Sequence, residues 1–308
     1  MASFLIGQPR VERALTHAFS SGRLAHGLLF AGPAGVGREK AARGVACALV
    51  CEQKLVPFGC GTCRACRRAL TGSHPDVHVL MPEAEAVRRG ISQPDAKKKP
   101  SADILVDAVR ELAVRLRMAP YEAGARVALV VDAHRMNTSA QNALLKTLEE
   151  PAPSTWIVLL VPHERTVLPT IASRCLRLSF APLAVDDVAA VLRGQGVADA
   201  DVRARLSEGS VARALAVDPA ARDAGGPLLR TLLEGTAAER LDFAEALGKE
   251  RSDVDAALSE LERLLAQAMR GADWRRAAST LERVHAARDA IAHNASVQLC
   301  LEELLLAR

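Results

Sequence analysis

Aromatic side chains are scarce in this chain of 308 residues, which contains 2 Trp, 1 Tyr and 6 Phe. A surface that stacks several bases of single-stranded nucleic acid on aromatic rings is therefore poorly supplied. The net charge of +4 is also too small to indicate a dedicated nucleic-acid-binding protein without a localised basic patch. We expect any contact with DNA to be made mainly to phosphates.

Long apolar runs are absent as well. No uninterrupted apolar stretch approaches the roughly 18 residues that a membrane span needs, and the N-terminus lacks the charged and then apolar pattern of a signal peptide. The seven cysteines are an odd number for a secreted disulfide framework, and several of them lie close together. The sequence predicts a cytoplasmic protein without a membrane segment.

Short apolar runs alternate with helical patterns in the first half of the chain. The runs are His26 to Ala31, Val127 to Val131 and Trp156 to Val161, and each is typical of a buried parallel strand. Between Asn137 and Glu150 a capping-type start, apolar residues at helical spacing and Pro151 as a stop predict a helix. This alternation indicates an α/β domain with a parallel sheet.

The second half has no strand pattern and is predicted to be helical. The length is about twice the roughly 150-residue prior for one domain, and the Gly-Gly-Pro sequence at 225–227 is the best linker candidate. We therefore predict an α/β domain over residues 1–180, a small helical domain over 181–224 and an all-helical domain over 225–308.

A glycine-rich loop follows the first predicted strand and precedes an Ala-rich helix. Its glycines are Gly32, Gly35 and Gly37, and this order of strand, loop and helix cradles nucleotide phosphates in P-loop proteins. The pattern G-x-x-x-x-G-K-[ST] continues with Lys for the terminal phosphates and a hydroxyl for Mg²⁺. This chain has Arg38 and Glu39 at those two positions.

These replacements argue against ATP turnover. A carboxylate from Glu39 about 4 Å from a phosphate charge would cost roughly 4 kcal/mol at an effective dielectric near 20, or about three decades in affinity. Asp132 at the end of the second strand could hold Mg²⁺, but Ala133 follows where a general base is needed to activate water. We expect a loop retained for packing, with Arg38 able to touch phosphate but no tight ATP binding. The alternative is a working ATPase that uses Gly37, Arg38 and Asp132.

Four cysteines form a C-x8-C-x2-C-x2-C cluster, namely Cys51, Cys60, Cys63 and Cys66. This spacing predicts a tetrahedral thiolate site for one Zn²⁺. Because the protein fills all four positions, the zinc would be structural rather than catalytic. Reduced free thiols and a redox switch are the alternatives, and Cys47 in an apolar segment is expected to be buried.

Several fragments together resemble a known family. They are GRLAHGLLFAGPAGVG at 22–37, the four-cysteine insertion, HPD at 74–76, LLKTLEEP at 144–151, TIASRC at 170–175, EGSVARAL at 208–215 and HNASVQLCLEELLL at 293–306. In combination they resemble the delta prime subunits of the bacterial DNA polymerase III clamp loader, a family of AAA+ proteins. The resemblance covers nearly the whole chain.

The resemblance implies an AAA+ fold with a nucleotide-binding-type domain, a helical lid and a C-terminal collar that joins five subunits in a ring. It maps the zinc ligands onto the four clustered cysteines and the family's Ser-Arg-Cys motif onto Ser173, Arg174 and Cys175. Arg174 would then be an arginine finger, presented in trans to ATP held by a neighbouring subunit. The sequence alone favours an ordinary surface arginine at this position.

The implied function is that of a noncatalytic stator subunit, which completes the ring with gamma/tau and delta subunits. The ring would load the beta sliding clamp onto primed DNA. In motor relatives a polar residue follows the third strand, whereas this chain has Val161 and Pro162 there. Arg213 falls where active relatives have a phosphate-sensing arginine, and both nucleotide contact and lid packing are consistent with it.

Two other functions remain open at this point. The first is an active, ATP-hydrolysing motor subunit of the gamma/tau kind. The second is nucleic-acid binding by the zinc module, because Arg64, Arg67 and Arg68 surround its cysteines. We prefer a solvated surface or a protein contact for these arginines, since aromatic partners are few.

Overall fold

The computed structural model describes residues 4–93, 99–216, 231–232, 235–248, 251–268, 274–292 and 295–306. The chain divides into two compact units, Met1–Ala216 and Val217–Arg308. The predicted linker at 225–227 lies outside the described residues. The division of the chain into three domains at 180 and 224 stays a prediction.

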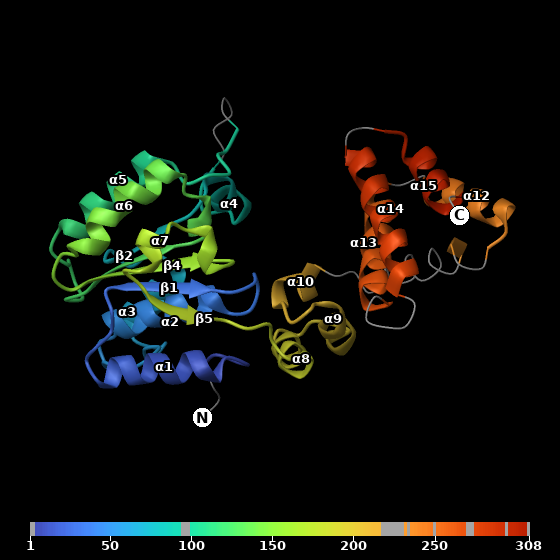
Figure 1. The fold of residues 1–308 in the computed structure, drawn as a ribbon. Coiled ribbons are helices and arrows are strands. Elements are labelled where there is room, and N and C mark those ends of the chain that lie inside the picture. The colour runs from blue at the N-terminus through green and yellow to red at the C-terminus, as the bar shows by residue number, and fades with distance from the viewer. Residues whose placement is uncertain are drawn as a thin grey trace. The chain divides into compact units, whose positions relative to one another are not determined.

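Five parallel strands form the sheet of the first unit, in the order β2-β3-β4-β1-β5 (Figure 1). The strands are β1 (Gly27–Ala31), β2 (Val77–Leu80), β3 (Arg126–Val130), β4 (Thr155–Val161) and β5 (Leu176–Ser179). The three strands predicted from apolar runs are β1, β3 and β4, which lie side by side in the middle of the sheet. The sequence analysis missed the two edge strands, β2 and β5.

Helices cover both faces of this sheet (Figure 1). One face carries α1 (Pro9–Ser20), α2 (Arg38–Val50) and α3 (Arg64–Thr71), and the other carries α5 (Val106–Arg117), α6 (Thr138–Glu149) and α7 (Pro169–Ala172). Successive strand residues point to opposite faces, so Leu28 and Phe30 belong to the first core and Leu29 to the second. The predicted α/β parallel-sheet class is confirmed.

Helix α6 begins and ends where its sequence predicts. The side chain of Asn137 caps it by accepting a hydrogen bond from the backbone N–H of Ala140 at 2.9 Å. The helix ends at Glu149, two residues before Pro151. Its buried side places Leu144 and Leu148 in the core shared with β3 and β4.

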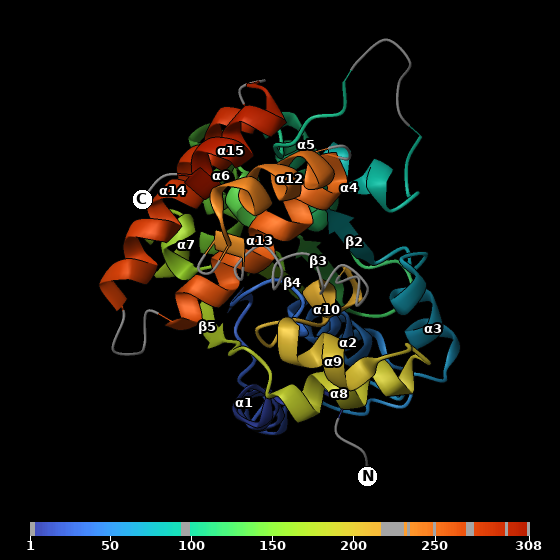
Figure 2. The ribbon, with the colours of Figure 1, turned by 90° about the vertical axis from the view of Figure 1, so that its right-hand side faces the viewer.

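Three helices follow the sheet within the first unit, as Figure 2 shows. They are α8 (Val185–Gly194), α9 (Ala200–Leu206) and α10 (Val211–Ala216), and they enclose a small apolar core of their own that includes Val188, Leu192 and Ala204. The hydroxyl of Ser210 donates to the carbonyl of Ala34 in the glycine-rich loop at 2.8 Å. The loop and this helical group are therefore joined by a direct hydrogen bond.

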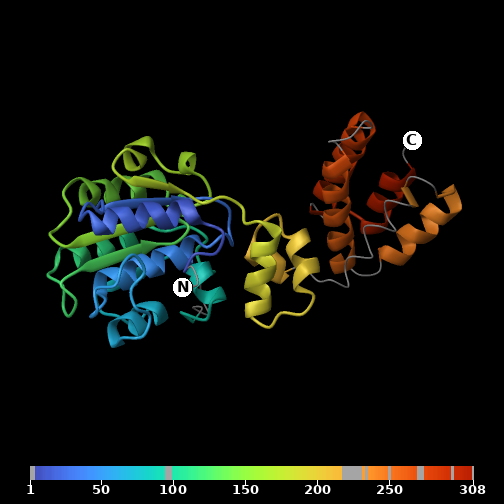
Figure 3. The same ribbon diagram turned by 90° about the horizontal axis from the view of Figure 1, so that it is seen from below.

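All the secondary-structure elements described in the second unit are helices (Figure 3). It contains α12 (Ala237–Leu247), α13 (Arg251–Ala268), α14 (Trp274–Ala292) and α15 (Val297–Leu306). Leu258, Val284 and Leu301 are fully buried in its core, with Cys300 beside them. Among the described helices, none combines the length and apolar character needed to cross a bilayer.

Candidate functional site

The four clustered cysteines converge on one point. Their Sγ atoms all lie within 4.8 Å of one another, and the Sγ atoms of Cys60 and Cys66 are 3.9 Å apart. Zinc bonds to sulfur of about 2.3 Å in a tetrahedron put the sulfurs about 3.8 Å apart. The spacing and the donor set therefore fit a metal ion bound by Cys51, Cys60, Cys63 and Cys66.

The backbone around these cysteines supports thiolates. The N–H of Cys63 donates to Cys60 Sγ at 3.2 Å, and the N–H of Cys66 donates to Cys63 Sγ at 3.4 Å. Hydrogen bonds from the Cys63 backbone and from Thr62 lower the pKa of the Cys60 thiol to about 6. The thiolate is the metal-binding form, so these hydrogen bonds favour that form of Cys60, whereas burial raises the pKa of the Cys66 thiol.

Cys47 lies under the cluster but is not part of it. Its Sγ donates to the carbonyl of Cys66 at 3.6 Å, and burial raises the pKa of its thiol to about 11. Its Sγ is not one of the four sulfur atoms that lie within 4.8 Å of one another. The expected burial of Cys47 is confirmed, at 1% exposure.

The glycines of the P-loop-type turn are required by packing against neighbouring backbone. Gly35 has φ +75°, and a Cβ there would lie 2.5 Å from the backbone nitrogen of Ala212 and collide with Ser210 Oγ. At Gly32 a Cβ would collide with the carbonyl oxygen of Phe180. Gly37 has φ +99° at the start of α2, with open space around it.

Arg38 and Glu39 turn to partners within the chain. Arg38 is 9% exposed, and its Nε donates to the carbonyl of Pro33 at 3.1 Å. Burial lowers the pKa of the Arg38 guanidinium, while Asp132 and Glu39 act to raise it. Arg38 therefore lies against the loop with its Nη1 buried and without a hydrogen-bond partner in the described part of the chain.

The carboxylate of Glu39 is neutralised by two arginines, Arg43 of the same helix and Arg89, which follows α4 (Glu83–Arg88). Both ion pairs have N to O distances of 2.9 Å. Burial opposes ionisation, but these hydrogen bonds and charges lower the pKa of Glu39. The uncompensated carboxylate assumed in the sequence argument is thus not what the structure contains, since Arg89 is distant in sequence. The ion pairs instead tie the residue at the hydroxyl position to α4.

A cavity of about 500 Å³ lies next to this loop. Residues of the loop, of α4, of the strand ends and of the following helices line it, among them Arg38, Glu85, Arg89, Asp132 and Val211. Arg89 also pairs with Glu85 at 2.5 Å. Glu39, Glu85 and Arg89 thus form one group of ion pairs at this cavity.

Arg174 lies at the surface, just after α7. It is exposed to about a third, its Nη2 pairs with Glu149 Oε1 at 2.7 Å and its Nη1 donates to the carbonyl of Thr170 at 2.9 Å. Ser173 beside it is exposed, whereas Cys175 is buried under the sheet edge. Of the Ser-Arg-Cys motif, Ser173 and Arg174 are thus exposed, and Cys175 is buried.

Two other arginines considered from the sequence are paired inside the chain. Arg213 forms an ion pair with Glu208, five residues before it and ahead of α10. Arg68 of the cysteine module pairs with Glu122 at 2.7 Å. Neither arrangement brings these side chains together with Arg38 or Arg174.

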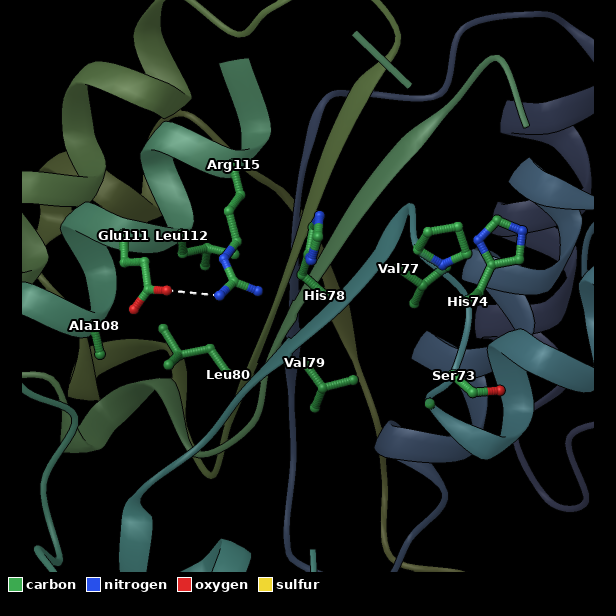
Figure 4. Close-up of a pocket in the computed structure, with 12 residues that line it drawn as sticks. Ser73, His74, Val77, His78, Val79, Leu80, Ala108, Glu111, Leu112 and Arg115 are labelled. Carbon is green, nitrogen blue, oxygen red and sulfur yellow. Dashed lines mark hydrogen bonds and ion pairs between the residues drawn. The ribbon is translucent and has the colours of Figure 1, made fainter. Parts of the chain in front are cut away.

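A second groove, of about 460 Å³, runs along the outer edge of β2 between that strand and α5 (Figure 4). Arg115 and Glu111 of α5 face each other on one side of it, and His78 projects from the strand. His74, on the other side, is buried and accepts a hydrogen bond from the N–H of Asp76 through Nδ1 at 3.1 Å. His74 thus serves the turn that leads into β2 and is not among the clustered metal-ligand candidates.

Asp76, next to this groove, is fully buried and fills a ready-made anion site. Its carboxylate accepts backbone N–H groups of Tyr121, Glu122 and Ala123 at 2.7 to 3.2 Å, with Arg126 at 3.5 Å. Burial acts to raise the pKa of this carboxyl, but these hydrogen bonds lower it overall. The three convergent backbone N–H groups therefore bind the carboxylate of Asp76 and not an external anion.

The sequence analysis missed Glu149, Arg43 and Arg89 as partners of its candidate residues. Arg43 follows Glu39 by four residues on one helix, which is a spacing that allows an ion pair. Arg89 and Glu149 carry no such signal, because the fold alone brings them to Glu39 and Arg174.

Comparison with known proteins identifies similar sequences. A family model described as "DNA polymerase III, delta subunit" matches residues 7–184, which is more than half of the chain. The chain is 38% identical over 154 residues to DNA polymerase III subunit delta′ of Pseudomonas aeruginosa, covering 50% of this chain and 42% of that protein. It is 34% identical over 175 residues to the Escherichia coli subunit delta′, covering 57% and 48%.

A longer alignment relates the chain to another subunit of the same polymerase. It is 29% identical over 279 residues to DNA polymerase III subunit tau of Escherichia coli, covering 88% of this chain and 41% of that protein. The matched region is less than half of the length of each of these three relatives.

Proposed function

This chain belongs to the DNA polymerase III delta′ family, and from that premise we propose that it is the noncatalytic stator subunit of a clamp loader. It joins gamma/tau and delta subunits in a five-membered ring in the cytoplasm. The ring places the beta sliding clamp on primed DNA, and this chain supplies Arg174 to ATP bound by its neighbour.

The observation that carries this proposal is a difference in how two charged sites are engaged. Arg38 is held by Pro33 and Glu39 by Arg43 and Arg89, so both side chains already have partners within the chain. Arg174 is about a third exposed and has N–H groups left over from its contacts with Glu149, Thr170 and Ser173. These contacts therefore support a chain that contributes Arg174 to a neighbour's ATP site rather than one that hydrolyses ATP at its own P-loop-type turn.

The chemistry of such a finger follows from its permanent charge. A guanidinium stabilises the negative charge that develops on the transferred phosphoryl group, and a preorganised charge does so with little rearrangement. Because the residue comes from a second subunit, hydrolysis then depends on assembly of the ring. The buried Cys175 fixes the backbone beneath Arg174 while the guanidinium stays at the surface.

We also assign a structural zinc ion to Cys51, Cys60, Cys63 and Cys66. Four thiolates leave no position for substrate or water, so the ion stabilises the local fold and takes no part in a reaction. The ion holds the turn before α3 to the end of α2, which the backbone bonds to sulfur already shape.

The test of the finger is ATP hydrolysis by the complete complex, measured with Arg174→Ala and Arg174→Lys subunits. Arginine fingers contribute about three decades or more in rate in other phosphoryl-transfer systems, and we expect a loss of at least tenfold for both variants with assembly unchanged. Arg177→Ala, an exposed arginine on β5, is the matched control. An unchanged rate for Arg174→Ala in fully assembled complexes would refute the role.

The motor alternative makes a different prediction for the isolated chain. An authentic ATPase would bind ATP at micromolar concentration and lose binding on Arg38→Ala. The stator proposal expects no binding by the isolated chain at millimolar ATP.

A further inference from the structure

The guanidinium of Arg174 has a defined orientation although it lies at the surface. Glu149, the last residue of α6, holds Nη2 at 2.7 Å, and the carbonyl of Thr170 in α7 holds Nη1 at 2.9 Å. One contact comes from each of two helices. The orientation of the side chain therefore depends on how α6 and α7 sit against each other.

The two helices are fixed to each other at a second point. Gln141 of α6 is buried, donates through Nε2 to the carbonyl of Met136 at 2.9 Å and accepts the N–H of Leu168 through Oε1 at 2.8 Å. Leu168 immediately precedes α7. The α7 segment is thus tied to the start of α6 by Gln141 and to its end by Glu149.

We propose that Glu149 is a positioning residue for Arg174, a role that rests on the proposed function of Arg174 as a finger in trans. An arginine side chain has many rotamers, and a carboxylate at one edge removes most of them before the neighbouring nucleotide is met. Charge-assisted hydrogen bonds are short and directional, so Glu149 sets the plane of the guanidinium as well as its place.

The contact with Glu149 orients Arg174 but does not occupy all of its N–H donors. A guanidinium has five N–H donors. Nη1 donates to Thr170 and, at 3.4 Å, to Ser173 Oγ, and Nη2 donates to Glu149, so the Nε–H and one Nη2–H have no partner among the described residues. These remaining donors are the ones that a phosphate of the neighbour would take. The cost is a nearby negative charge, and solvent screens it because both side chains are more than one-third exposed.

The experiment measures ATP hydrolysis by the complete complex carrying Glu149→Ala. Exposed ion pairs are modest, so we expect kcat to fall about two- to fivefold, with KM unchanged because ATP binding belongs to the neighbour. Glu149→Gln keeps an oxygen that accepts from Nη2 and should restore part of the rate. Glu150→Ala, at the adjacent exposed residue, is the control and should leave the rate unchanged.

A double variant separates positioning from a merely structural role. In the Arg174→Ala background, Glu149→Ala should have no further effect on kcat, since it acts only through the arginine. A further fall of the same size, an unchanged rate in the single variant, or a rate above wild type would each overturn the proposal. Thermal melting of the free subunit checks that Glu149→Ala folds.

Failure of the two proposals can be told apart. If Arg174→Ala leaves the rate unchanged, the finger is refuted and the positioning role falls with it. If Arg174→Ala abolishes stimulation while Glu149→Ala matches Glu150→Ala, only the positioning role is overturned.

Discussion

The cysteine module and the P-loop-type turn are both glycine-containing loops with side chains of the kind that bind ions, yet the structure arranges them in opposite ways. In the cysteine module, four sulfur atoms point at a common centre. In the P-loop-type turn, Arg38 folds against the carbonyl of Pro33 and Glu39 pairs with Arg43 and Arg89. The cysteine module thus brings its four sulfur atoms together, whereas the charged side chains of the P-loop-type turn are engaged by other groups of the same chain.

The difference shows that a binding motif is completed by what the rest of the fold does with its side chains. Backbone N–H groups support the cysteines from within the same short segment. One of the residues that engage Glu39 is Arg89, just after α4 and fifty positions later in the chain. A local pattern therefore describes the first site well and the second poorly.

Removal of metal from the cysteine module should have the largest effect. Structural zinc sites contribute about 10–16 kcal/mol of apparent binding free energy in small zinc peptides, so chelation should unfold the segment from Cys51 to α3. Metal content and circular dichroism of the purified chain measure this. Cys63→Ser should lose the ion, whereas Cys47→Ala should retain one per chain; loss from both would place Cys47 in the ligand set.

Asp76→Asn should have the next largest effect, because it breaks a filled anion site. An amide N–H₂ cannot replace a carboxylate that accepts three backbone N–H groups, and we expect unfolding free energy to fall by about 3 kcal/mol near pH 7. Urea denaturation measures it, with exposed Asp103→Asn as the control. A loss below about 0.5 kcal/mol would mean that the convergent amides do not need a charge.

The same carboxylate gives a pH dependence of known sign. The pKa of Asp76 is lower in the folded chain than the ordinary value near 3.9. Its contribution to stability is therefore complete above the unfolded pKa and is lost as pH falls through the folded pKa. The gap between wild type and Asp76→Asn should narrow below about pH 4.

Introducing the Lys and Thr of the P-loop pattern should make the P-loop-type turn a better ligand-binding loop. Arg38→Lys combined with Glu39→Thr removes the contacts to Pro33, Arg43 and Arg89 and supplies the expected Lys and hydroxyl. We expect ATP with Mg²⁺ to bind at least tenfold more tightly than to the wild-type chain, measured by calorimetry. Micromolar binding by the wild type would instead favour the motor alternative.

Glu39→Gln alone should have the smallest effect. The pairs with Arg43 and Arg89 are partly exposed, so we expect less than about 1 kcal/mol of lost stability. Melting at low and high salt measures it, and the difference should shrink at high salt. A loss of several kcal/mol would show that α4 depends on this carboxylate for its position.

Much of the fold was predictable because buried strands and capped helices leave local patterns. The runs at β1, β3 and β4 are fully apolar since both faces of these central strands are covered. Edge strands β2 and β5 are four residues long with partly exposed side chains, so they lack that signal. Asn137 and Pro151 marked α6 to within one or two residues.

The candidate sites divide along the same line. The cysteine spacing located the cluster of four sulfur atoms because all four cysteines lie in one short segment. The contact of Glu149 with Arg174 joins two elements separated by a strand, and no residue spacing announces it. The departure from the P-loop pattern at Arg38 and Glu39 was also visible in the sequence. The contact of Glu39 with Arg89 was not, because the two residues are far apart along the chain.

The tight fit of Gly35 against Ser210 and Ala212 has an evolutionary consequence. Any side chain at this position would push on the first residues of α10, whatever the loop binds. Selection for folding alone is thus sufficient to preserve this glycine, whether or not the loop binds phosphate. The glycines of a nucleotide-binding motif can therefore persist in a chain because they let the loop pack against the helical segment at Ser210 and Ala212.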